Sequence, residues 1–303
     1  MDEPDFQSMA MNRRRRWYLD ASPAALVCLA VVATGCAAPY PEGTVSQLLP
    51  DPPPPQERSY SADGRQIHYV EVDAGPARVL LIHGSPGSWQ GWAPLMREPR
   101  LRERASLLAP DRPGWGQSGY GQMLPDLADQ SRLLAPLLDA PGQRTLLVAH
   151  SYGAAVALRL ALDRPQQVSG LVLVAPTLSP ELERPSWYDH LARVPPFRWL
   201  LPKRLRLSYV ELRPLPAELR AMRAQWASLT VPVEVVQGDE DSQVDPRTAD
   251  FAEQVFTPQQ LRVMRVPGAG HDVPWQQPRL IADTVVATLR RADHAQPAAA
   301  AAN

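Results

Sequence analysis

Ser151 is the residue whose surroundings most clearly indicate chemistry. It lies in the pentapeptide AHSYG at residues 149–153, between the apolar run 145–148 and the helix-forming run 154–158. A serine at the tip of a sharp turn from strand to helix is the arrangement of a nucleophile elbow, in which Oγ stands clear of the sheet. Taken alone, the pentapeptide fits a structural turn equally well. The residues in the other polar loops are needed to distinguish a catalytic serine from a structural one.

A nucleophilic serine needs a partner, because its hydroxyl attacks poorly at neutral pH until a base takes the proton. Four further apolar runs end in glycine-rich loops with polar residues: runs 77–82, 107–110, 233–237 and 261–266 lead into HGSPGS, DRPGWGQSG, GDED and GAGH. Along the chain the candidates therefore come in the order serine, acid, histidine. His271, flanked by two glycines that let its loop fold back, is the candidate base.

The order and spacing of these five motifs resemble the α/β-hydrolase superfamily over roughly residues 59–291. The resemblance implies a mainly parallel sheet flanked by helices, with a small helical cap, and an active site at the carboxyl ends of the strands. It assigns Ser151 as the nucleophile and His271 as its base. It also implies an oxyanion hole made by the backbone amides of Ser85 and Tyr152.

The catalytic histidine needs a carboxylate that fixes its tautomer and stabilises the imidazolium. Three aspartates follow the strand at 233–237, namely Asp239, Asp241 and Asp245. The family pattern Gly-x-x-Asp selects Asp241 as the acid. Asp239 is expected to cap backbone amides in the turn, and Asp245 to cap the helix that begins at the following proline.

Other polar residues in the motifs have structural interpretations. The resemblance directs the His150 side chain away from the nucleophile and gives His83 the task of bonding loop backbone. Residues 111–119 are expected to be structural, with Trp115 as a candidate for the pocket wall. Metal-ligand spacing and a phosphate-binding loop are both missing from the sequence, so neither a metal nor another cofactor is expected.

Residues 59–295 are expected to form the hydrolase domain, since strands alternate with amphipathic helices after an entry hairpin. Residues 177–230 interrupt this alternation where the superfamily places its cap. The interruption contains Trp187, Tyr188, Phe197, Trp199, Tyr209, Met222 and Trp226. Any single one can attach a cap helix to the core, but as a group they predict an apolar roof over Ser151 and a substrate with a hydrophobic part.

Length, net charge and cysteine content exclude several classes of function. With 303 residues, 45% of them apolar, the chain is long enough for one large α/β domain with an inserted cap. Its formal charge of −1 gives no support to nucleic-acid binding, which needs a basic patch. Both cysteines, Cys28 and Cys36, lie near the N-terminus, so neither a disulfide nor thiol catalysis is expected in the folded part. The oligomeric state stays open.

The N-terminal residues 1–36 have the pattern of a targeting segment. Four arginines at 13–16 precede an apolar stretch at 24–33 and the sequence ATGC, which resembles a bacterial lipobox ending at Cys36. Acylation of Cys36 would anchor the protein in the cell envelope, with the outer membrane favoured because residue 37 is not aspartate. A plain signal peptide is the alternative. Proline-rich residues 37–58 are expected to be an extended spacer outside any sheet, and alanine-rich residues 296–303 a disordered tail.

The leading hypothesis is a serine hydrolase that cleaves a carboxylic ester with a hydrophobic acyl or alcohol part through an acyl-enzyme. An aspartate at the elbow would indicate a haloalkane dehalogenase or epoxide hydrolase, and position 151 holds serine. The alternatives are a proline iminopeptidase-like enzyme, a carbon–carbon hydrolase or a cofactor-free haloperoxidase-like enzyme with the same triad. A non-catalytic binding lipoprotein is the alternative from another class.

Overall fold

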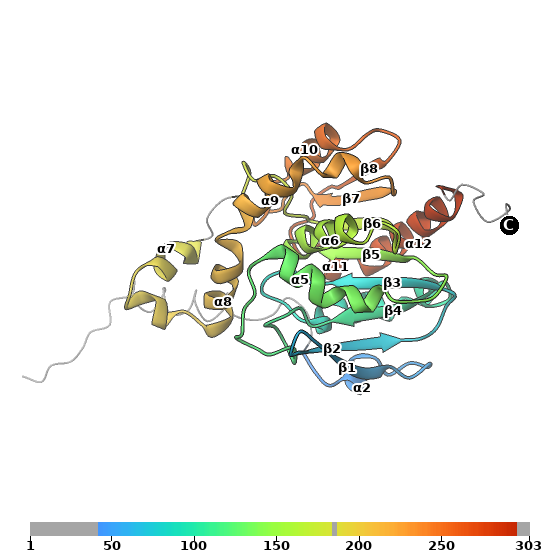
Figure 1. Cartoon of the computed structure of the whole chain (residues 1–303), viewed down its shortest axis with the longest axis horizontal. Coiled ribbons are helices and arrows are strands. Elements are labelled where there is room, and N and C mark those ends of the chain that lie inside the picture. Colours follow the sequence, from blue (N-terminus) through green and yellow to red (C-terminus); the bar gives the residue numbers. More distant parts are fainter. Residues whose placement is uncertain (1–41, 184–186, 296–303) are drawn as a thin grey trace, which may run out of the picture. The chain divides into compact units, whose positions relative to one another are not determined.

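A computed structural model describes residues 42–183 and 187–295, which contain one eight-stranded sheet of order β1-β2-β4-β3-β5-β6-β7-β8. The strands are β1 (Gln56–Ala62), β2 (Arg65–Val72), β3 (Ala77–Ile82), β4 (Ala105–Pro110), β5 (Thr145–His150), β6 (Val168–Val174), β7 (Val233–Gly238) and β8 (Leu261–Val266). The entry hairpin β1–β2 joins β4 antiparallel, and every other neighbouring pair is parallel. The predicted α/β fold class is confirmed (Figure 1).

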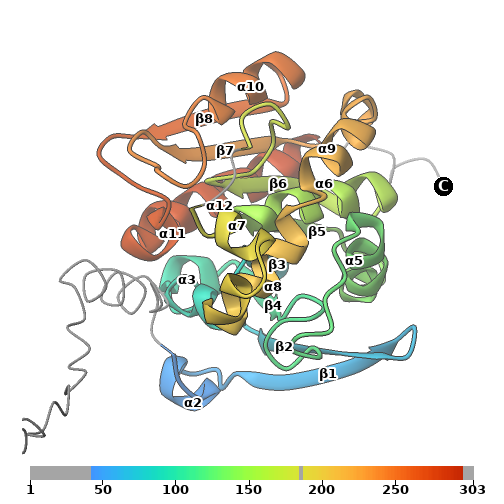
Figure 2. The same cartoon turned by 90° about the vertical axis from the view of Figure 1, so that its left-hand side faces the viewer.

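Helices cover both faces of this sheet (Figure 2). One buried cluster includes side chains of α5 (Leu127–Leu134), α6 (Tyr152–Asp163) and α10 (Thr248–Val255). The other includes α3 (Ala93–Met96), α4 (Pro99–Arg102), α11 (Val273–Gln276) and α12 (Pro278–Ala295). Short 3-10 turns extend two of these layers, η1 (Trp89–Trp92) before α3 and η2 (Ala135–Leu138) after α5.

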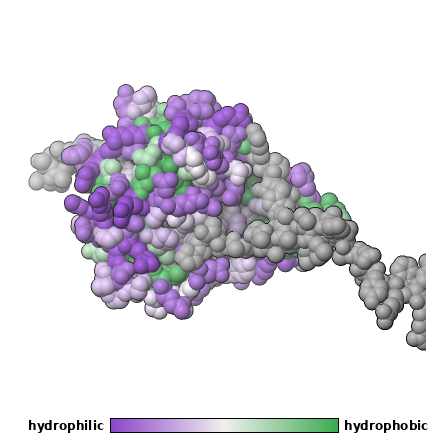
Figure 3. Space-filling view, turned by 180° about the vertical axis from the view of Figure 1, so that it is seen from behind, coloured by the Kyte–Doolittle hydropathy of each residue, from purple (hydrophilic) through white to green (hydrophobic). Residues whose placement is uncertain are grey.

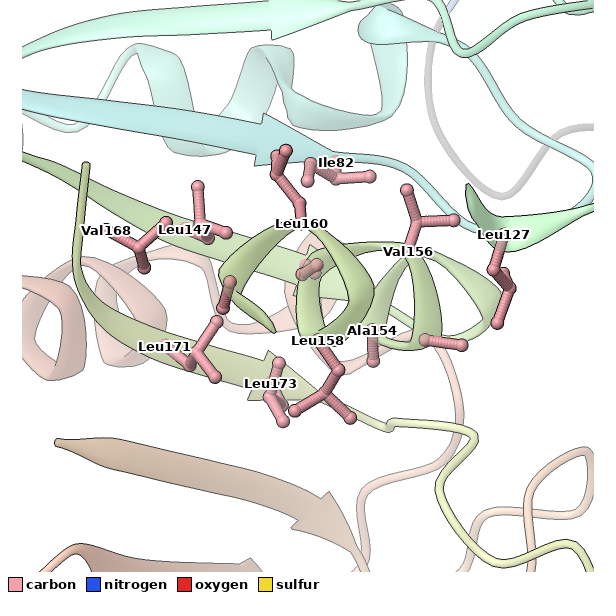
Figure 4. Close-up of a cluster of buried hydrophobic side chains, with 14 of the residues drawn as sticks. Ile82, Leu127, Leu147, Ala154, Val156, Leu158, Leu160, Val168, Leu171 and Leu173 are labelled. Atoms are coloured by element: carbon pink, nitrogen blue, oxygen red, sulfur yellow. The ribbon is translucent and has the colours of Figure 1, made fainter. Parts of the chain in front are cut away.

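The central strands β5 and β6 are buried along their whole length, as expected for parallel strands covered on both faces. Helix α6 packs on them directly, and Figure 4 shows Leu158 beside Leu173 and other apolar side chains of the layer. The start of this helix is thereby fixed relative to the end of β5. This rigid junction is where Ser151 lies.

The insertion between β6 and β7 forms the helical cap. It consists of α7 (Trp187–Arg193), η3 (Phe197–Leu200), α8 (Lys203–Leu212), α9 (Leu215–Arg223) and η4 (Trp226–Ser228). Figures 1 and 2 show α7 and α8 beyond the carboxyl ends of the parallel strands. Helices α7 and α8 share a small core of Tyr188, Ala192, Leu201 and Leu205, separate from the two main clusters. Helices α7 and α8 therefore have a core of their own, and cap side chains outside this core are available to contact the loops around Ser151 or the solvent.

The expected extended spacer at 37–58 is wrong for its described part. Residues 45–48 form helix α2 (Val45–Leu48), because Thr44 and Gln47 make a capping box. Leu49 is buried in the second cluster, and strand β1 starts already at Gln56. Val45 and Leu48 pack against the same cluster, and Arg102 donates to the carbonyls of Asp51 and Pro53, so the segment is attached to the domain despite its prolines.

Residues 1–41, which include the predicted targeting segment and Cys36, and the predicted tail at 296–303 lie outside the described residues. Within the described ranges, none of the helices combines the length and the apolar character that a membrane crossing requires.

Candidate active site

Ser151 sits at a strained turn between β5 and α6. Its backbone angles are φ 53° and ψ −126°, a combination that a residue with a side chain rarely adopts. Hydrogen bonds hold this conformation: the Ser151 amide donates to Val174 of β6, and its carbonyl accepts from the amides of Ala154 and Thr177. The turn predicted from the pentapeptide is present, and β6, the segment after it and the first turn of α6 stabilise it.

The glycine of the pentapeptide is required by a close approach. A Cβ atom at position 153 would lie 2.5 Å from the carbonyl oxygen of Ile82 and 2.6 Å from that of His83. These carbonyls belong to the end of β3 and the loop after it. Gly153 therefore lets α6 start directly beside that loop, which brings Ser151 next to the segment carrying Ser85.

His271 and Asp241 form a buried pair. His271 Nδ1 donates to Asp241 Oδ2 over 2.9 Å, and the other carboxylate oxygen accepts from the amides of Gln243 and Val244 at 2.8 and 2.9 Å. Burial opposes ionisation of Asp241, but the hydrogen bonds from His271 and from the two amides hold the pKa of this carboxyl below its usual value. The ionised carboxylate fixes His271 with Nδ1 protonated, which leaves Nε2 as the basic atom.

The two loops that carry this pair meet because of a second glycine. A Cβ at position 238, the last residue of β7, would lie 2.2 Å from the carbonyl oxygen of Ala269. Of the competing aspartates, Asp239 accepts from the Gly268 amide over 2.6 Å, and Asp245 accepts from the Arg247 amide and side chain. Asp241 is thus the aspartate that the structure pairs with His271.

Ser151 and His271 line one cavity of about 160 Å³, together with Ser85 and cap residues. The structure shows no direct hydrogen bond between Ser151 Oγ and His271 within the described part of the chain. Catalytic hydrogen bonds are often long before a substrate binds and shorten in the complex. Ser151 and His271 thus line the same cavity, and they are not hydrogen-bonded to each other in this structure.

His150 supports His271, a role that the sequence did not reveal. Its Nε2 donates to the His271 carbonyl over 3.1 Å, and the two rings lie 4.6 Å apart between centroids. Burial, with the neighbouring His271, lowers the pKa of His150 to about 3. His150 is therefore neutral at ordinary pH and packs against His271 without adding a charge beside the base.

The two predicted oxyanion donors occupy suitable backbone positions. Tyr152 begins α6, and the first amides of a helix have no partner within the helix. The Ser85 amide belongs to the same peptide group as the Gly84 carbonyl, and that carbonyl accepts from Arg112 Nη2 over 2.8 Å. Because carbonyl and N–H of one peptide point in opposite directions, Arg112 fixes the direction of the Ser85 N–H.

Arg112 also joins this loop to the cap. Its guanidinium makes two bonds to Glu211 of α8, at 2.8 and 3.0 Å, and both side chains are fully buried. It donates further to the His83 carbonyl and to Gln130, and lies over the Tyr152 ring at 4.7 Å from the centroid. One buried guanidinium thus contacts both segments that supply the predicted oxyanion amides.

A second contact joins the same helix to the same loop. Ser85 Oγ donates to Ser208 Oγ over 3.1 Å, and Ser208 Oγ lies 3.2 Å from the Tyr188 hydroxyl. Ser208 and Glu211 are three positions apart on α8, so they share one face of the helix. This inner face of the cap holds the loop that carries Ser85.

The expected structural role of His83 is confirmed: its Nδ1 donates to the Gly84 carbonyl and its Nε2 accepts from the Arg112 amide. Asp111 accepts from the amides of Trp89 and Gln117 and pairs with His68. Trp115 is buried against His83 and is absent from the residues that line the cavity. It supports the loops and does not form a pocket wall.

The apolar roof expected over Ser151 is also wrong. Of the seven large side chains of the insertion, Tyr188 and Tyr209 line the cavity, whereas Trp226 is buried in the core and Trp199 is exposed. The side chain of Trp187 lies outside the described atoms. Four charged residues share the cavity wall instead: Glu183, Asp189, Arg193 and Arg213. Burial raises the pKa of Glu183 to about 7, so this wall changes its charge near neutral pH.

The described residues contain no group of three or more histidine, cysteine, aspartate or glutamate side chains placed to hold a metal ion. The site consists of a serine on a strained turn, a histidine oriented by a carboxylate, and backbone amides in a loop held by Arg112. Such a set can take a proton from a hydroxyl and stabilise a developing oxyanion.

Comparison with known proteins agrees with this geometry. Residues 79–284 match the alpha/beta hydrolase family, a span of more than half of the chain. The chain therefore belongs to the alpha/beta hydrolase family.

The curated relatives differ in activity. A haloalkane dehalogenase of Mesorhizobium japonicum is 38% identical over 109 residues, which are 36% of this chain and 35% of that protein. Lipase LipV of Mycobacterium tuberculosis is 40% identical over 108 residues, 35% of this chain and 40% of the lipase. The chain thus matches well under half of the length of these relatives.

A solved structure extends the likeness in fold. The haloalkane dehalogenase DatA from Agrobacterium tumefaciens C58 superposes with a TM-score of 0.66 at 22% identity, covering 78% of this chain and 97% of the dehalogenase. At this identity the comparison shows a shared fold.

Proposed function

We propose that this protein is a serine hydrolase that cleaves a carboxylic ester through an acyl-enzyme. The observation that carries the proposal is the shared cavity of Ser151 and His271, with His271 bonded to Asp241 at 2.9 Å. The lipase relative supports ester chemistry. The dehalogenase relatives raise another possibility, but the residue at the turn is a serine, which is suited to acyl transfer.

In the proposed reaction, Ser151 Oγ attacks the ester carbonyl carbon while His271 takes the hydroxyl proton. The negative oxygen of the tetrahedral intermediate accepts hydrogen bonds from the Ser85 and Tyr152 amides. Collapse breaks the carbon–oxygen bond, and His271 protonates the leaving alcohol. Water, deprotonated by His271, then attacks the acyl group on Ser151 and releases the carboxylic acid.

The cavity favours a small ester with a hydrophobic part and a polar part. Tyr188, Tyr209 and Leu212 provide apolar surface, and charged side chains form the remaining wall. A volume of about 160 Å³ suits a short acyl or alcohol group better than a long chain. We include in the proposal a lipid anchor at Cys36 and a location in the bacterial cell envelope, with no nucleic-acid partner.

The test combines an activity probe with a substrate panel. A fluorophosphonate should label the wild type, and Ser151→Ala should lose the label and about 10⁶ of ester turnover. Ser228→Ala, at an exposed serine of η4, is the matched control and should keep both. The panel contains p-nitrophenyl esters of graded length, a proline arylamide and a haloalkane.

Turnover that persists in Ser151→Ala would reject the proposal. Halide release without ester cleavage would assign the dehalogenase activity instead, and arylamide cleavage alone would assign the iminopeptidase-like alternative. A folded wild type that neither binds the probe nor turns over any substrate would favour a binding protein.

A further inference from the structure

The outer side of the cap exposes an unusual set of apolar side chains. Of the eight large hydrophobic residues that are exposed in the described part of the chain, six lie within 191–210. They are Leu191, Val194, Phe197, Trp199, Leu200 and Val210, and we call them the outer cap surface. Trp199 and Leu200 are 65% and 75% exposed. By contrast, Figure 3 shows a face on which hydrophobic areas lie scattered among hydrophilic ones.

These residues are not a poorly packed cap core. The cap has its own buried core, formed by Tyr188, Ala192, Leu201 and Leu205. Leu200 and Leu201 are neighbours in sequence, yet one is 75% exposed and the other 4%. One set of apolar cap residues is therefore buried in the cap core, and the residues of the outer cap surface are exposed. An exposed apolar patch of this kind is typical of a site that binds a partner.

The segment that carries this surface is rich in basic residues. Residues 190–213 contain six basic side chains, namely Arg193, Arg198, Lys203, Arg204, Arg206 and Arg213, of which Arg193 and Arg213 also line the cavity. The acidic residue in this range, Glu211, is fully buried in its pair with Arg112. The whole chain has a formal charge of −1, so the positive charge of the cap is a local feature.

Basic groups also lie directly beside the exposed aromatic rings. The guanidinium carbons of Arg198 and Arg206 are 5.1 and 5.0 Å from the Trp199 ring centroid. Lys203 Nζ lies 4.4 Å from the ring of Tyr120, which is itself 44% exposed. Basic groups thus lie in contact with exposed aromatic rings at two places, Trp199 of the cap and Tyr120 of the loop beside it.

We propose that the outer cap surface docks on a lipid bilayer that contains anionic phospholipid. Tryptophan and phenylalanine with aliphatic residues can enter the headgroup and upper acyl region, while the surrounding arginines and Lys203 bind lipid phosphates. The positive sign of the exposed charges is complementary to an anionic membrane surface. Aliphatic residues such as Leu200 and Val194 distinguish this surface from one that binds nucleic acid, where bases need aromatic stacking.

Docking would bring the bilayer close to the cavity. Helix α7 supplies Tyr188 and Arg193 to the cavity wall and Leu191 to the outer cap surface. A substrate that partitions into the membrane would then be concentrated beside the cavity. The docking proposal itself requires neither ester hydrolysis nor an acyl group on Cys36.

The test places a reporter on the surface itself. In the full chain, Cys28→Ser and Cys36→Ser remove the acylation site and the native thiols, and Leu200→Cys carries a nitrobenzoxadiazole dye. The same dye on Met264→Cys, an exposed position of β8, is the matched control. Vesicles contain phosphatidylglycerol and phosphatidylcholine, with or without a spin-labelled quencher lipid, or phosphatidylcholine alone.

The dye at position 200 should shift to shorter wavelength and be quenched by the spin-labelled lipid in anionic vesicles, whereas the dye at 264 should do neither. Arg198→Gln combined with Lys203→Gln should raise the lipid concentration that gives half of the dye shift at position 200 more than tenfold, at about fivefold for each basic group.

Three results would overturn the proposal. In the first, the dye at 200 stays in water while the protein still sediments with vesicles. In the second, the dye at 200 shifts and is quenched equally with phosphatidylcholine alone. In the third, the dye shifts without lipid as protein concentration rises, which would assign the surface to a second copy of the chain.

Discussion

The two sides of the cap each contain side chains that are uncommon in such a position. On the side facing the sheet, Ser208 and Glu211 are fully buried and bond to the loops around Ser85. On the outer cap surface, Trp199 and Leu200 are mostly exposed. Packing alone would favour the opposite arrangement, since burying a charge is costly and exposing apolar surface gives no stabilisation.

The buried polar residues of the inner side and the exposed apolar residues of the outer side are better explained by their binding partners than by a contribution to the stability of the cap. A buried ion pair is weak evidence for stability, because desolvation offsets the attraction between the charges. The pair of Arg112 and Glu211 instead fixes a carbonyl whose peptide N–H is a proposed oxyanion donor. The inner side thus aligns the proposed catalytic loops, and the outer side presents a docking surface.

The largest effect is expected at the centre that the inner side aligns. Asp241→Asn keeps the side-chain shape but removes the charge that orients His271, so kcat should fall by up to ~10⁴. Asp245→Asn, which changes a carboxylate bonded to Arg247, is the matched control and should cost little activity. Steady-state kinetics on a p-nitrophenyl ester measure both variants. Equal losses in the two would show that the loop, and not the Asp241 charge, is what matters.

A smaller but still large effect is expected from the inner side of the cap. Arg112→Met leaves Glu211 buried without its charge partner, which should lower the free energy of unfolding by roughly 3–5 kcal/mol. It also removes one of the two side-chain donors to the Gly84 carbonyl, the other being His83 Nδ1, so kcat should fall by up to about 10²–10³, the loss expected for one oxyanion donor. Denaturant titration and kinetics measure the two quantities separately.

Glu211→Gln distinguishes positioning from stability. Glutamine keeps one oxygen that can accept from Arg112 but loses the second acceptor, so Glu211→Gln should destabilise the protein less than Arg112→Met does. Its kcat should lie closer to the wild-type value than that of Arg112→Met, with little change in KM. Arg220→Met, at an exposed arginine of α9, is the control that should change neither quantity. A kcat that is normal in Arg112→Met once the protein is folded would contradict the positioning role.

Sequence reasoning located the sheet and the candidate triad because their signals are local. The apolar run at 77–82 coincides with β3, and the Gly-x-x-Asp register selected the aspartate that bonds His271. Each of these features depends on a few consecutive residues. The pair of Arg112 and Glu211 joins residues 99 positions apart and leaves no local pattern.

The cap was harder to predict for a related reason. Aromatic residues in the sequence predict apolar contacts, but they do not indicate on which face of a small helical cap those contacts lie. Trp199 was therefore expected over the cavity and is found outside. The signal that could have revealed this is charge: arginines surround Trp199 in sequence at 198, 204 and 206, as on a solvent-facing surface.

An effect of a few-fold is expected from the cavity wall. Burial raises the pKa of Glu183 to about 7, so the side chain is neutral below this pH and negative above it. For an ester that carries a carboxylate, kcat/KM should therefore fall by about fivefold as pH rises through 7, the factor that ~1 kcal/mol of repulsion gives. Normalising to a neutral ester removes the titration of the triad. Glu183→Gln should abolish the fall, and an unchanged fall in this variant would place the titrating group elsewhere.

The smallest effect, a change in the free energy of unfolding, is expected for a substitution on the outer side of the cap. Leu200 is 75% exposed, so Leu200→Ser removes little packing and should change the free energy of unfolding by no more than about 0.5 kcal/mol. Leu205, which is 7% exposed in the cap core, is the matched inner position, and Leu205→Ala should cost roughly 2–5 kcal/mol. Hydrogen exchange of the α8 amides reports local opening of the cap, which global unfolding does not detect. A large loss of protection in Leu200→Ser would mean that this leucine stabilises the cap, and the outer cap surface would then need no partner to explain it.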